Sequence, residues 1–314
     1  MSLNVRLGPL ELNNPITTAS GTFGYGLEFT DFVDLSTLGG LCTKGLSLQP
    51  HAGNPPPRIC ETPAGMLNAI GLQNVGIEVF LSEKLPRLRE LGATVIANVW
   101  GDLEEDYVTV VRALESAEGV AAIELNISCP NVERGGMLFG NSPPLTHSLV
   151  SKVREATRRP LIVKLSPNAP DLVESARAAR TAGADVLSLV NTFVGMAIDP
   201  ETARPRISFG TGGLSGPAIR PLAVRMVYQV ARALPDVPLM GIGGISELSD
   251  VLEFLAAGAT AVQVGTANFR DPAVSGRLVR ELSEYCEARG RTISELIGRA
   301  HRVGQAGGDA GAEG

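Results

Sequence analysis

Apolar and polar positions along this chain follow two periods, one typical of buried strands and one typical of amphipathic helices. Eight short apolar runs have the length and composition of strands covered on both faces. These runs are residues 16–19, 40–43, 94–99, 121–127, 161–165, 186–190, 239–242 and 261–264. Apolar residues recur at helical spacing in eight further segments between and after them. These segments are residues 28–35, 77–91, 104–116, 145–158, 171–182, 217–233, 246–257 and 272–288.

Eight strands alternating with eight helices predict a (β/α)8 TIM barrel, an α/β fold. A doubly wound open sheet is the alternative, but it usually has fewer repeats. A short β-hairpin is predicted within residues 4–12, before the barrel. No change in composition divides the chain, so we expect one domain over residues 1–303. Residues 304–314 contain few apolar side chains and are expected to form a disordered tail.

Long connections follow predicted strands two, four and six, and the clearest are residues 45–76 and 191–216. Connections of this length inside a compact domain are usually binding loops or lids. All of them leave the carboxyl ends of the strands, where barrel enzymes carry their active sites. We therefore expect the functional site at this end of the barrel.

A cysteine lies just beyond the fourth predicted strand. Pro130 cannot extend a strand ladder, so it places Cys129 at or just past the end of that strand. A thiol between Asn126 and Asn131 can act as a base or nucleophile. A buried, unreactive cysteine is the alternative interpretation.

Single polar residues end six of the predicted strands, where apolar ones would otherwise be expected. They are Ser20, Lys44, Asn98, Asn126, Lys164 and the pair Asn191–Thr192. Any one of them could be a cap or a turn residue. Six such polar strand ends at one end of the barrel favour a binding site for a planar polar ligand. A lysine inside an apolar run, such as Lys164, needs an anionic partner or a shifted pKa.

Glycine clusters follow in the last third of the chain, at residues 210–216, 241–246 and 264–266. Glycines before helix N-termini let backbone amides approach a phosphate, although turns also favour glycine. The usual phosphate site of a barrel follows strands seven and eight. The dinucleotide fingerprint Gly-x-Gly-x-x-Gly is absent after strand one, which argues against NAD binding in a Rossmann-type site.

Composition excludes several classes of function. The chain has 314 residues, 44% of them hydrophobic, and a net charge of −6, which disfavours nucleic acid and anionic membranes as partners. Its four cysteines contain no Cys-x-x-Cys pair, and its three histidines show no metal-binding spacing, so no metal site is predicted. No signal peptide and no apolar run of membrane-spanning length is found, so a cytoplasmic location is expected.

Several longer motifs resemble the dihydroorotate dehydrogenase family, over roughly residues 4 to 288. The motifs are residues 18–24 (TASGTFG), 43–45 (TKG), 53–55 (GNP), 68–74 (NAIGLQN), 126–131 (NISCPN), 163–167 (VKLSP) and 212–216 (GGLSG). The resemblance is greatest to the class 1B, NAD-linked form. It implies an FMN-binding barrel that oxidises dihydroorotate to orotate in pyrimidine biosynthesis.

The resemblance also implies roles for individual residues. Cys129 would be the base that takes the C5 proton while the C6 hydride passes to FMN. Substrate-binding residues would be Lys44, Asn68, Ala69, Ile70, Gly71, Leu72, Asn126, Asn131, Asn191 and Thr192. FMN-binding residues would be Ser20, Lys44, Gly45, Asn98, Asn126, Lys164, Val190, Gly216, Gly243, Gly244, Gly265 and Thr266.

The class 1B resemblance further implies a homodimer joined to a partner subunit, which carries FAD and a [2Fe–2S] cluster and passes electrons to NAD, as a heterotetramer. Gln49, His51 and Trp100 depart from what the family pattern leads us to expect, at positions away from the cofactor and base. Alternatives are a fumarate-linked class 1A enzyme, a dihydropyrimidine dehydrogenase-like enzyme, and a non-catalytic barrel that binds a phosphorylated metabolite.

Overall fold

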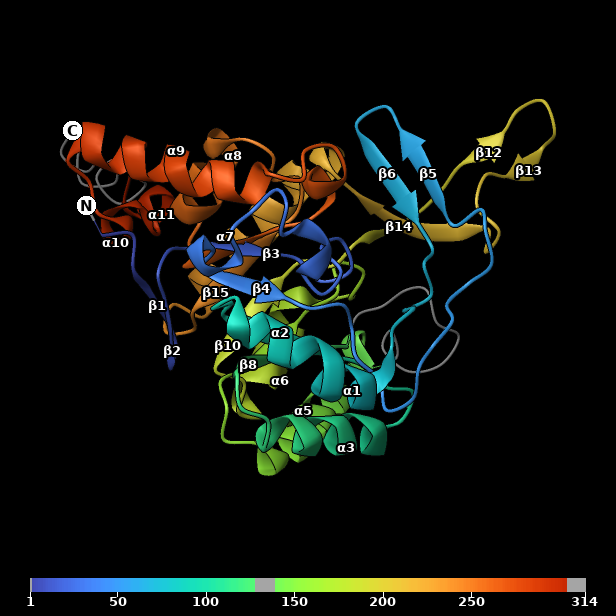
Figure 1. Ribbon diagram of the computed structural model, residues 1–314. Helices are drawn as coiled ribbons and strands as arrows, with labels where there is room; N and C mark the ends of the chain where they lie inside the picture. The colour runs from blue at the N-terminus through green and yellow to red at the C-terminus, as the bar shows by residue number, and fades with distance from the viewer. Residues whose placement is uncertain (1, 128–138, 304–314) are drawn as a thin grey trace, which may run out of the picture.

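A closed parallel barrel forms the centre of the computed structural model, which describes residues 2–127 and 139–303. Each barrel strand pairs with the next along the chain, and the last pairs with the first, as a (β/α)8 barrel requires (Figure 1). The barrel strands are β3 (Ile16–Thr18), β4 (Gly40–Cys42), β7 (Val95–Val99), β8 (Val120–Asn126), β9 (Leu161–Lys164), β10 (Val186–Leu189), β15 (Leu239–Ile242) and β16 (Ala261–Val264). The predicted fold is confirmed.

Helices fill the connections between the barrel strands and cover its outside (Figure 1). They are α1 (Gly76–Val79), η3 (Phe80–Lys84), α2 (Leu85–Glu90), α3 (Glu104–Glu115), α5 (Pro143–Ala156), α6 (Leu172–Thr181), η4 (Pro217–Ile219), α7 (Arg220–Ala233), α8 (Leu248–Ala256), η5 (Thr266–Phe269) and α9 (Val274–Arg289). Two further helices, α10 (Ile293–Leu296) and α11 (Arg299–Val303), follow. Asp171 caps α6, since its side chain accepts a hydrogen bond from the Glu174 amide at 3.0 Å.

The predicted helix over residues 28–35 is wrong. Two 3₁₀ turns, η1 (Leu27–Phe29) and η2 (Leu35–Thr37), occupy this connection instead. The Asp34 side chain accepts from the Ser36 amide at 3.0 Å and starts the second turn, so it interrupts the helical pattern.

Two long connections pair with each other to form an antiparallel sheet that the sequence analysis did not predict. Its strands are β5 (Ile59–Thr62) and β6 (Gly65–Asn68) from the first connection, and β11 (Phe193–Met196) and β14 (Thr211–Ser215) from the second. The order is β11-β14-β6-β5, so β14 joins the two connections through its pairing with β6. A small ribbon of β12 (Ile198–Asp199) and β13 (Arg204–Pro205) extends beyond it (Figure 1).

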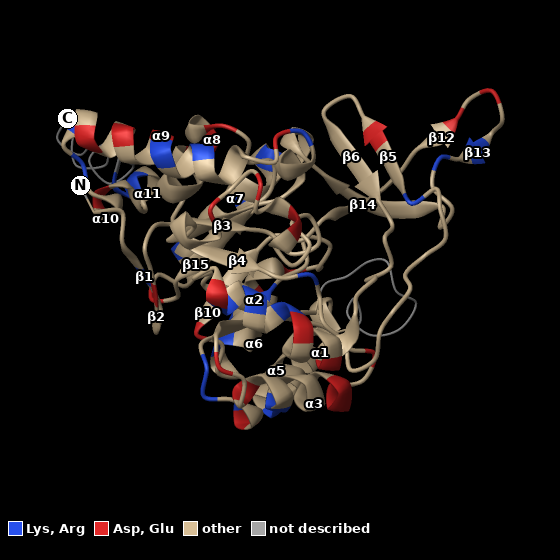
Figure 2. Cartoon of the chain, viewed as in Figure 1, with Lys and Arg blue, Asp and Glu red and all other residues tan. Residues whose placement is uncertain are grey.

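The predicted N-terminal hairpin is present as β1 (Val5–Leu7) and β2 (Leu10–Leu12), at the amino ends of the barrel strands. A Cβ built on Gly8 would lie 3.3 Å from the Asp185 carbonyl, just before β10, so the turn packs closely there. Charged residues lie mainly on the helices and loop tips rather than on the barrel strands (Figure 2). In the described ranges, no helix is long and apolar enough to cross a membrane.

Candidate active site

A cavity of about 290 Å³ lies where the carboxyl ends of the barrel strands meet the antiparallel sheet. All eight barrel strands contribute residues that end the strand or follow it directly. They include Ala19 and Ser20, Lys44 and Gly45, Asn98, Asn126, Lys164, Val190 and Asn191, Ile242 and Gly243, and Gly265 and Thr266. The convergence predicted from the polar strand ends therefore exists.

Nearly all of the predicted site residues that the structure describes line this cavity. The exception is Ala69, which is fully buried beside Leu67 and Ile207 in a small core of the antiparallel sheet. Cys129 and Asn131 lie outside the described residues. The lining also includes Arg58, Gln73 and Ser215, which the sequence analysis missed.

Two lysines enter the cavity without a carboxylate partner. Among the residues described, no acidic oxygen lies within 4 Å of either Lys44 or Lys164 in a salt bridge. Lys164 is buried, and its Nζ lies 3.4 Å from the Ser20 hydroxyl. Burial, and then the positive charge of Arg58, lower the pKa of Lys44. Both ammonium groups are therefore suited to bind an anionic ligand.

Amide side chains also line the cavity. Asn191 Nδ2 donates to Asn126 Oδ1 at 3.3 Å, and Asn68 Nδ2 donates to the Gly213 carbonyl at 3.2 Å. The side-chain Oδ1 of Asn191 accepts from the Thr192 backbone amide at 2.9 Å. These contacts hold donors and acceptors in fixed directions, which suits the edge of a planar heterocycle.

Glycines bring the backbone to the cavity wall. A Cβ built on Gly244 would lie 2.8 Å from the Gly216 carbonyl, and one on Gly243 would lie 2.7 Å from Ala223 Cβ, so neither position has room for a side chain. Gly265 differs, since the nearest protein atom to its added Cβ would be Ala19 Cβ at 3.5 Å. An added Cβ on Gly265 would make only ordinary contacts with the protein, and Gly265 lines the cavity.

A buried carboxylate supports the site from inside the barrel. Glu124 Oε1 accepts from Cys42 Sγ at 3.2 Å and from Asn98 Nδ2 at 2.7 Å. Its Oε2 accepts from Ser188 Oγ at 2.9 Å and from Gln263 Nε2 at 2.7 Å. This network was not predicted from the sequence, because a single Glu in an apolar strand carries no spacing signal.

The Glu124 network fixes its neighbours. Burial, and then the Glu124 charge, hold the pKa of the Cys42 thiol well above its ordinary value, so the thiol stays a donor. Since a carboxylate only accepts, Asn98 must present its NH₂ group to Glu124. The Asn98 Oδ1 is buried and has no hydrogen-bond partner within the part of the chain that the structure describes.

The departures from the family pattern at His51 and Trp100 contact each other. Their rings meet edge to face at 5.4 Å between centroids, and neither residue lines the cavity. Trp100 is buried, and His51 is exposed and pairs through its backbone with Asn74. The two changes therefore form one local packing unit outside the cavity.

The fold and this cavity together define a TIM-barrel protein whose cavity, lined by two lysines and several amide side chains, lies at the carboxyl ends of its strands. A sequence model of the family described as dihydroorotate dehydrogenase matches residues 2–286. The chain belongs to the dihydroorotate dehydrogenase family, a family of oxidoreductases, and the resemblance seen in the sequence is confirmed.

Individual relatives agree with this assignment. A protein of Geotalea uraniireducens is 55% identical over 297 residues, which cover 94% of this chain and 97% of the relative. A protein of Trichlorobacter lovleyi is 55% identical over 298 residues, covering 95% and 98%. Both are named "Dihydroorotate dehydrogenase B (NAD(+)), catalytic subunit".

A solved structure is similar in fold. It is the DHODH of Eimeria tenella in complex with ferulenol, with a TM-score of 0.80 at 23% identity. The alignment covers 96% of this chain and 89% of the other. At this identity the likeness concerns the fold alone.

Proposed function

We propose that this chain oxidises (S)-dihydroorotate to orotate in de novo pyrimidine biosynthesis, as the catalytic subunit of a class 1B, NAD-linked enzyme. The observation that carries the proposal is the convergence of Lys44, Lys164 and several amide side chains on one cavity at the mouth of the barrel. Family membership gives the reaction class. The names of the relatives from Geotalea and Trichlorobacter support the NAD-linked form.

The proposed substrate matches the chemistry of the cavity. Orotate is a planar carboxylate with an imide edge, so it needs one cation and a row of amide donors and acceptors. We assign the carboxylate to Lys44 and the imide edge to Asn68, Asn126, Asn131, Asn191 and Thr192. The segment from Asn68 to Leu72 would cover the substrate, because all of it except Ala69 lines the cavity.

FMN fits the remaining part of the cavity. Its phosphate would take the backbone amides of Gly216, Gly243, Gly244, Gly265 and Thr266, which all line the cavity. The unpartnered Asn98 Oδ1 offers an acceptor, and buried Lys164 offers a cation that would stabilise negative charge on the ring. The other proposed FMN contacts are Ser20, Lys44, Gly45, Asn126 and Val190.

Cys129 is the proposed base. Bound FMN supplies an acceptor for the hydride that leaves C6 of the substrate. Cys129 would take the proton from C5, which needs the thiol pKa to be drawn toward the working pH. The residue follows β8 closely in the sequence, and β8 ends at Asn126, which lines the cavity.

The electrons then need a second acceptor. The relatives' names contain the terms "catalytic subunit" and "NAD(+)", which support a partner subunit and NAD for this step. We propose a homodimer of this chain joined to a partner subunit with FAD and a [2Fe–2S] cluster, as a heterotetramer. The single domain over residues 1–303 and the cytoplasmic location stay predictions.

An anaerobic visible spectrum of the purified chain, before and after dihydroorotate is added, tests the proposal. We expect a yellow protein that bleaches, and Cys129→Ala should slow bleaching by roughly 10²–10⁴-fold, the usual contribution of a general base. Cys60→Ala is the matched control, because Cys60 does not line the cavity.

Each remaining outcome has a separate meaning. A protein that stays yellow would keep the flavin and overturn the substrate, and a colourless protein that FMN cannot reconstitute would overturn the cofactor. Reoxidation by fumarate without a partner subunit would contradict the NAD-linked class. Bleaching by dihydrouracil in place of dihydroorotate would show the other substrate class.

A further inference from the structure

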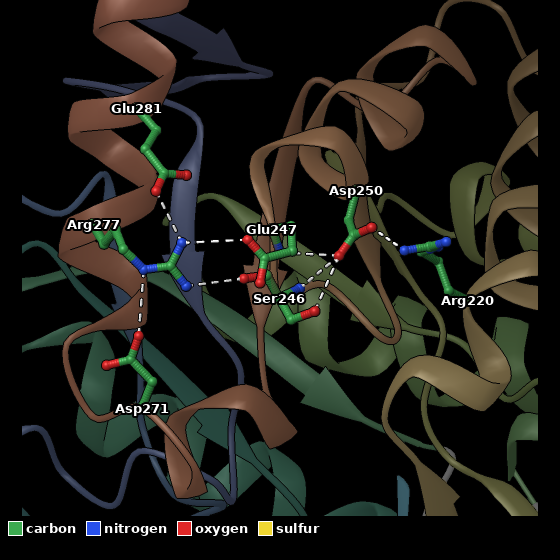
Figure 3. Close-up of polar contacts among 7 residues, drawn as sticks. All are labelled: Arg220, Ser246, Glu247, Asp250, Asp271, Arg277 and Glu281. Carbon is green, nitrogen blue, oxygen red and sulfur yellow. Dashed lines mark hydrogen bonds and ion pairs between the residues drawn. The ribbon is translucent and has the colours of Figure 1, made fainter. Parts of the chain in front are cut away.

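A network of polar and charged side chains joins segments that follow the glycine loops of the cavity, and Figure 3 shows its residues. It links the starts of three successive helices: Arg220 begins α7, Ser246 to Asp250 begin α8, and Asp271 and Arg277 flank the start of α9. Each of these helices follows a connection that lines the cavity, at Gly216, Gly244 and Gly265. The network therefore joins the supports of three separate wall segments.

Asp250 is the centre of this network and is 1% exposed. Its Oδ2 accepts from the backbone amides of Ser246 at 2.9 Å and Glu247 at 3.0 Å, which is the ordinary capping of a helix start. Its Oδ1 accepts from Arg220 Nη1, which belongs to a different helix. Capping accounts for the first two contacts and not for the third.

Arg220 binds neighbouring carboxylates and is not placed to contact a ligand. Its guanidinium binds Asp250 and lies 3.2 Å from Glu253 Oε2, so two carboxylates already neutralise it. It does not line the cavity. A Cβ built on Gly244 would be 2.9 Å from Arg220 Cβ, so the glycine loop rests directly on the arginine stem.

Arg277 holds the same loop from the side of α9. Its Nη2 donates to the Ser246 carbonyl at 3.2 Å, and its Nη1 donates to Glu281 at 2.9 Å (Figure 3). Its Nε donates to Asp271 Oδ2 at 3.3 Å, next to the connection from Gly265. Ser246 is thus held at its amide by Asp250 and at its carbonyl by Arg277.

We propose that Arg220 and Asp250 are positioning residues for the phosphate of the cofactor. The ion pair fixes the spacing between Gly216 and Gly244, whose backbone would cradle that phosphate, without touching the ligand itself. The inference rests on the proposed function, because it takes FMN as the occupant of the cavity. It predicts that breaking the pair weakens recognition of the phosphate and leaves recognition of the flavin ring.

The test compares FMN with riboflavin, which has the same ring and lacks the phosphate. Both would be titrated into the deflavinated full chain, with quenching of flavin fluorescence as the signal. Arg220→Gln and Asp250→Asn should weaken FMN binding roughly tenfold, the loss expected when one charge-assisted hydrogen bond is weakened. Riboflavin affinity should stay within about twofold, so the preference for FMN falls.

Arg154→Gln is the matched control. Arg154 Nη1 pairs with Asp185 Oδ2 at 2.9 Å, with both side chains partly buried, at the amino ends of the strands. This variant should leave both affinities unchanged. Arg220→Lys keeps the charge and loses the planar guanidinium, so its FMN affinity should lie between those of the wild type and Arg220→Gln. This variant replaces Asp250→Asn in the test if Asp250→Asn does not fold.

Equal losses for FMN and riboflavin, or no loss of FMN affinity in Arg220→Gln, would overturn the inference. A wild-type chain that binds FMN no better than riboflavin would overturn the proposed phosphate site, and the inference with it. The two failures are distinguished by the wild-type titration alone.

Discussion

The barrel and the antiparallel sheet above it are built by different means, although both line the same cavity. Barrel strands such as β7 and β9 are buried at every residue and pair in parallel. In the sheet, β5 and β11 alternate between exposed and partly buried residues. Its own core consists of Leu67, Ala69 and Ile207.

The hydrogen bonds of the polar side chains also differ between the barrel and the sheet. Inside the barrel, Glu124 binds four side chains from four other strands, so the strand ends cannot shift independently. No comparable network joins the described side chains of the sheet, where Asn68 binds a backbone carbonyl of its neighbour strand. We infer that the barrel sets the geometry of the site, while the sheet covers it and opens at lower cost.

Replacing Glu124 gives the largest expected effect and tests the barrel side of this comparison. Glu124→Leu leaves the buried donors of Asn98, Ser188 and Gln263 without an acceptor, so the free energy of unfolding should fall by roughly 3–5 kcal/mol. Urea denaturation measures the loss. Cys42→Ala, which removes one weak donor from the same network, should cost much less; equal costs would mean that the network does not hold the barrel.

Lys44 follows β4 in the barrel and faces both regions, so its replacement sharpens the comparison. Lys44→Met removes the cation proposed for the substrate carboxylate, and orotate affinity should fall roughly tenfold to a hundredfold. Lys152→Met, on the exposed face of α5, is the control and should bind orotate normally. Unchanged orotate binding in Lys44→Met would assign the carboxylate to another residue.

The buried Lys44 also predicts that the free energy of unfolding depends on pH, and the same variant tests this. Because burial lowers the pKa of Lys44 below its ordinary value of 10.5, the unfolded chain binds more protons between the two values. The ligand-free wild type should therefore gain stability as the pH rises through that window. Lys44→Met should lack this gain and be more stable than wild type at neutral pH. Urea midpoints at several pH values would show the difference, and parallel curves would contradict it.

The contrast between the two regions also explains how far the sequence could predict the structure. Barrel strands bury both faces, so they appear as apolar runs, and the polar residue at each end, such as Lys164, stands out. Strands β5 and β14 contain Glu, Thr, Gly and Ser and are half exposed, so nothing distinguishes them from a loop. The pairing of β14 with β6 joins residues about 145 positions apart, Asn68 and Gly213, and no local pattern encodes it.

The site residues also divide into those that the sequence predicts and those that it does not. Residues at strand ends could be predicted because the barrel topology brings all such ends together. Arg58 and Gln73 reach the cavity from the first long connection, and the path of that connection depends on its pairing with β14. Arg220 and Asp250 appear in the sequence as ordinary residues of helix first turns, and their pairing appears only when α7 and α8 are packed together.

The smallest expected effect tests the sheet side. Met196 on β11 is 50% exposed, whereas Phe193 on the same strand packs against the main core. Met196→Ser should change the free energy of unfolding by no more than about 0.5 kcal/mol, the usual range for a surface position. Phe193→Ser, on the other face, should cost roughly 2 kcal/mol or more, because it removes buried aromatic area. Similar losses for both variants in urea denaturation would mean that the outer face of the sheet is covered in the folded protein. If the wild type were then a dimer that dissociates in Met196→Ser, a second copy of this chain would be what covers this face.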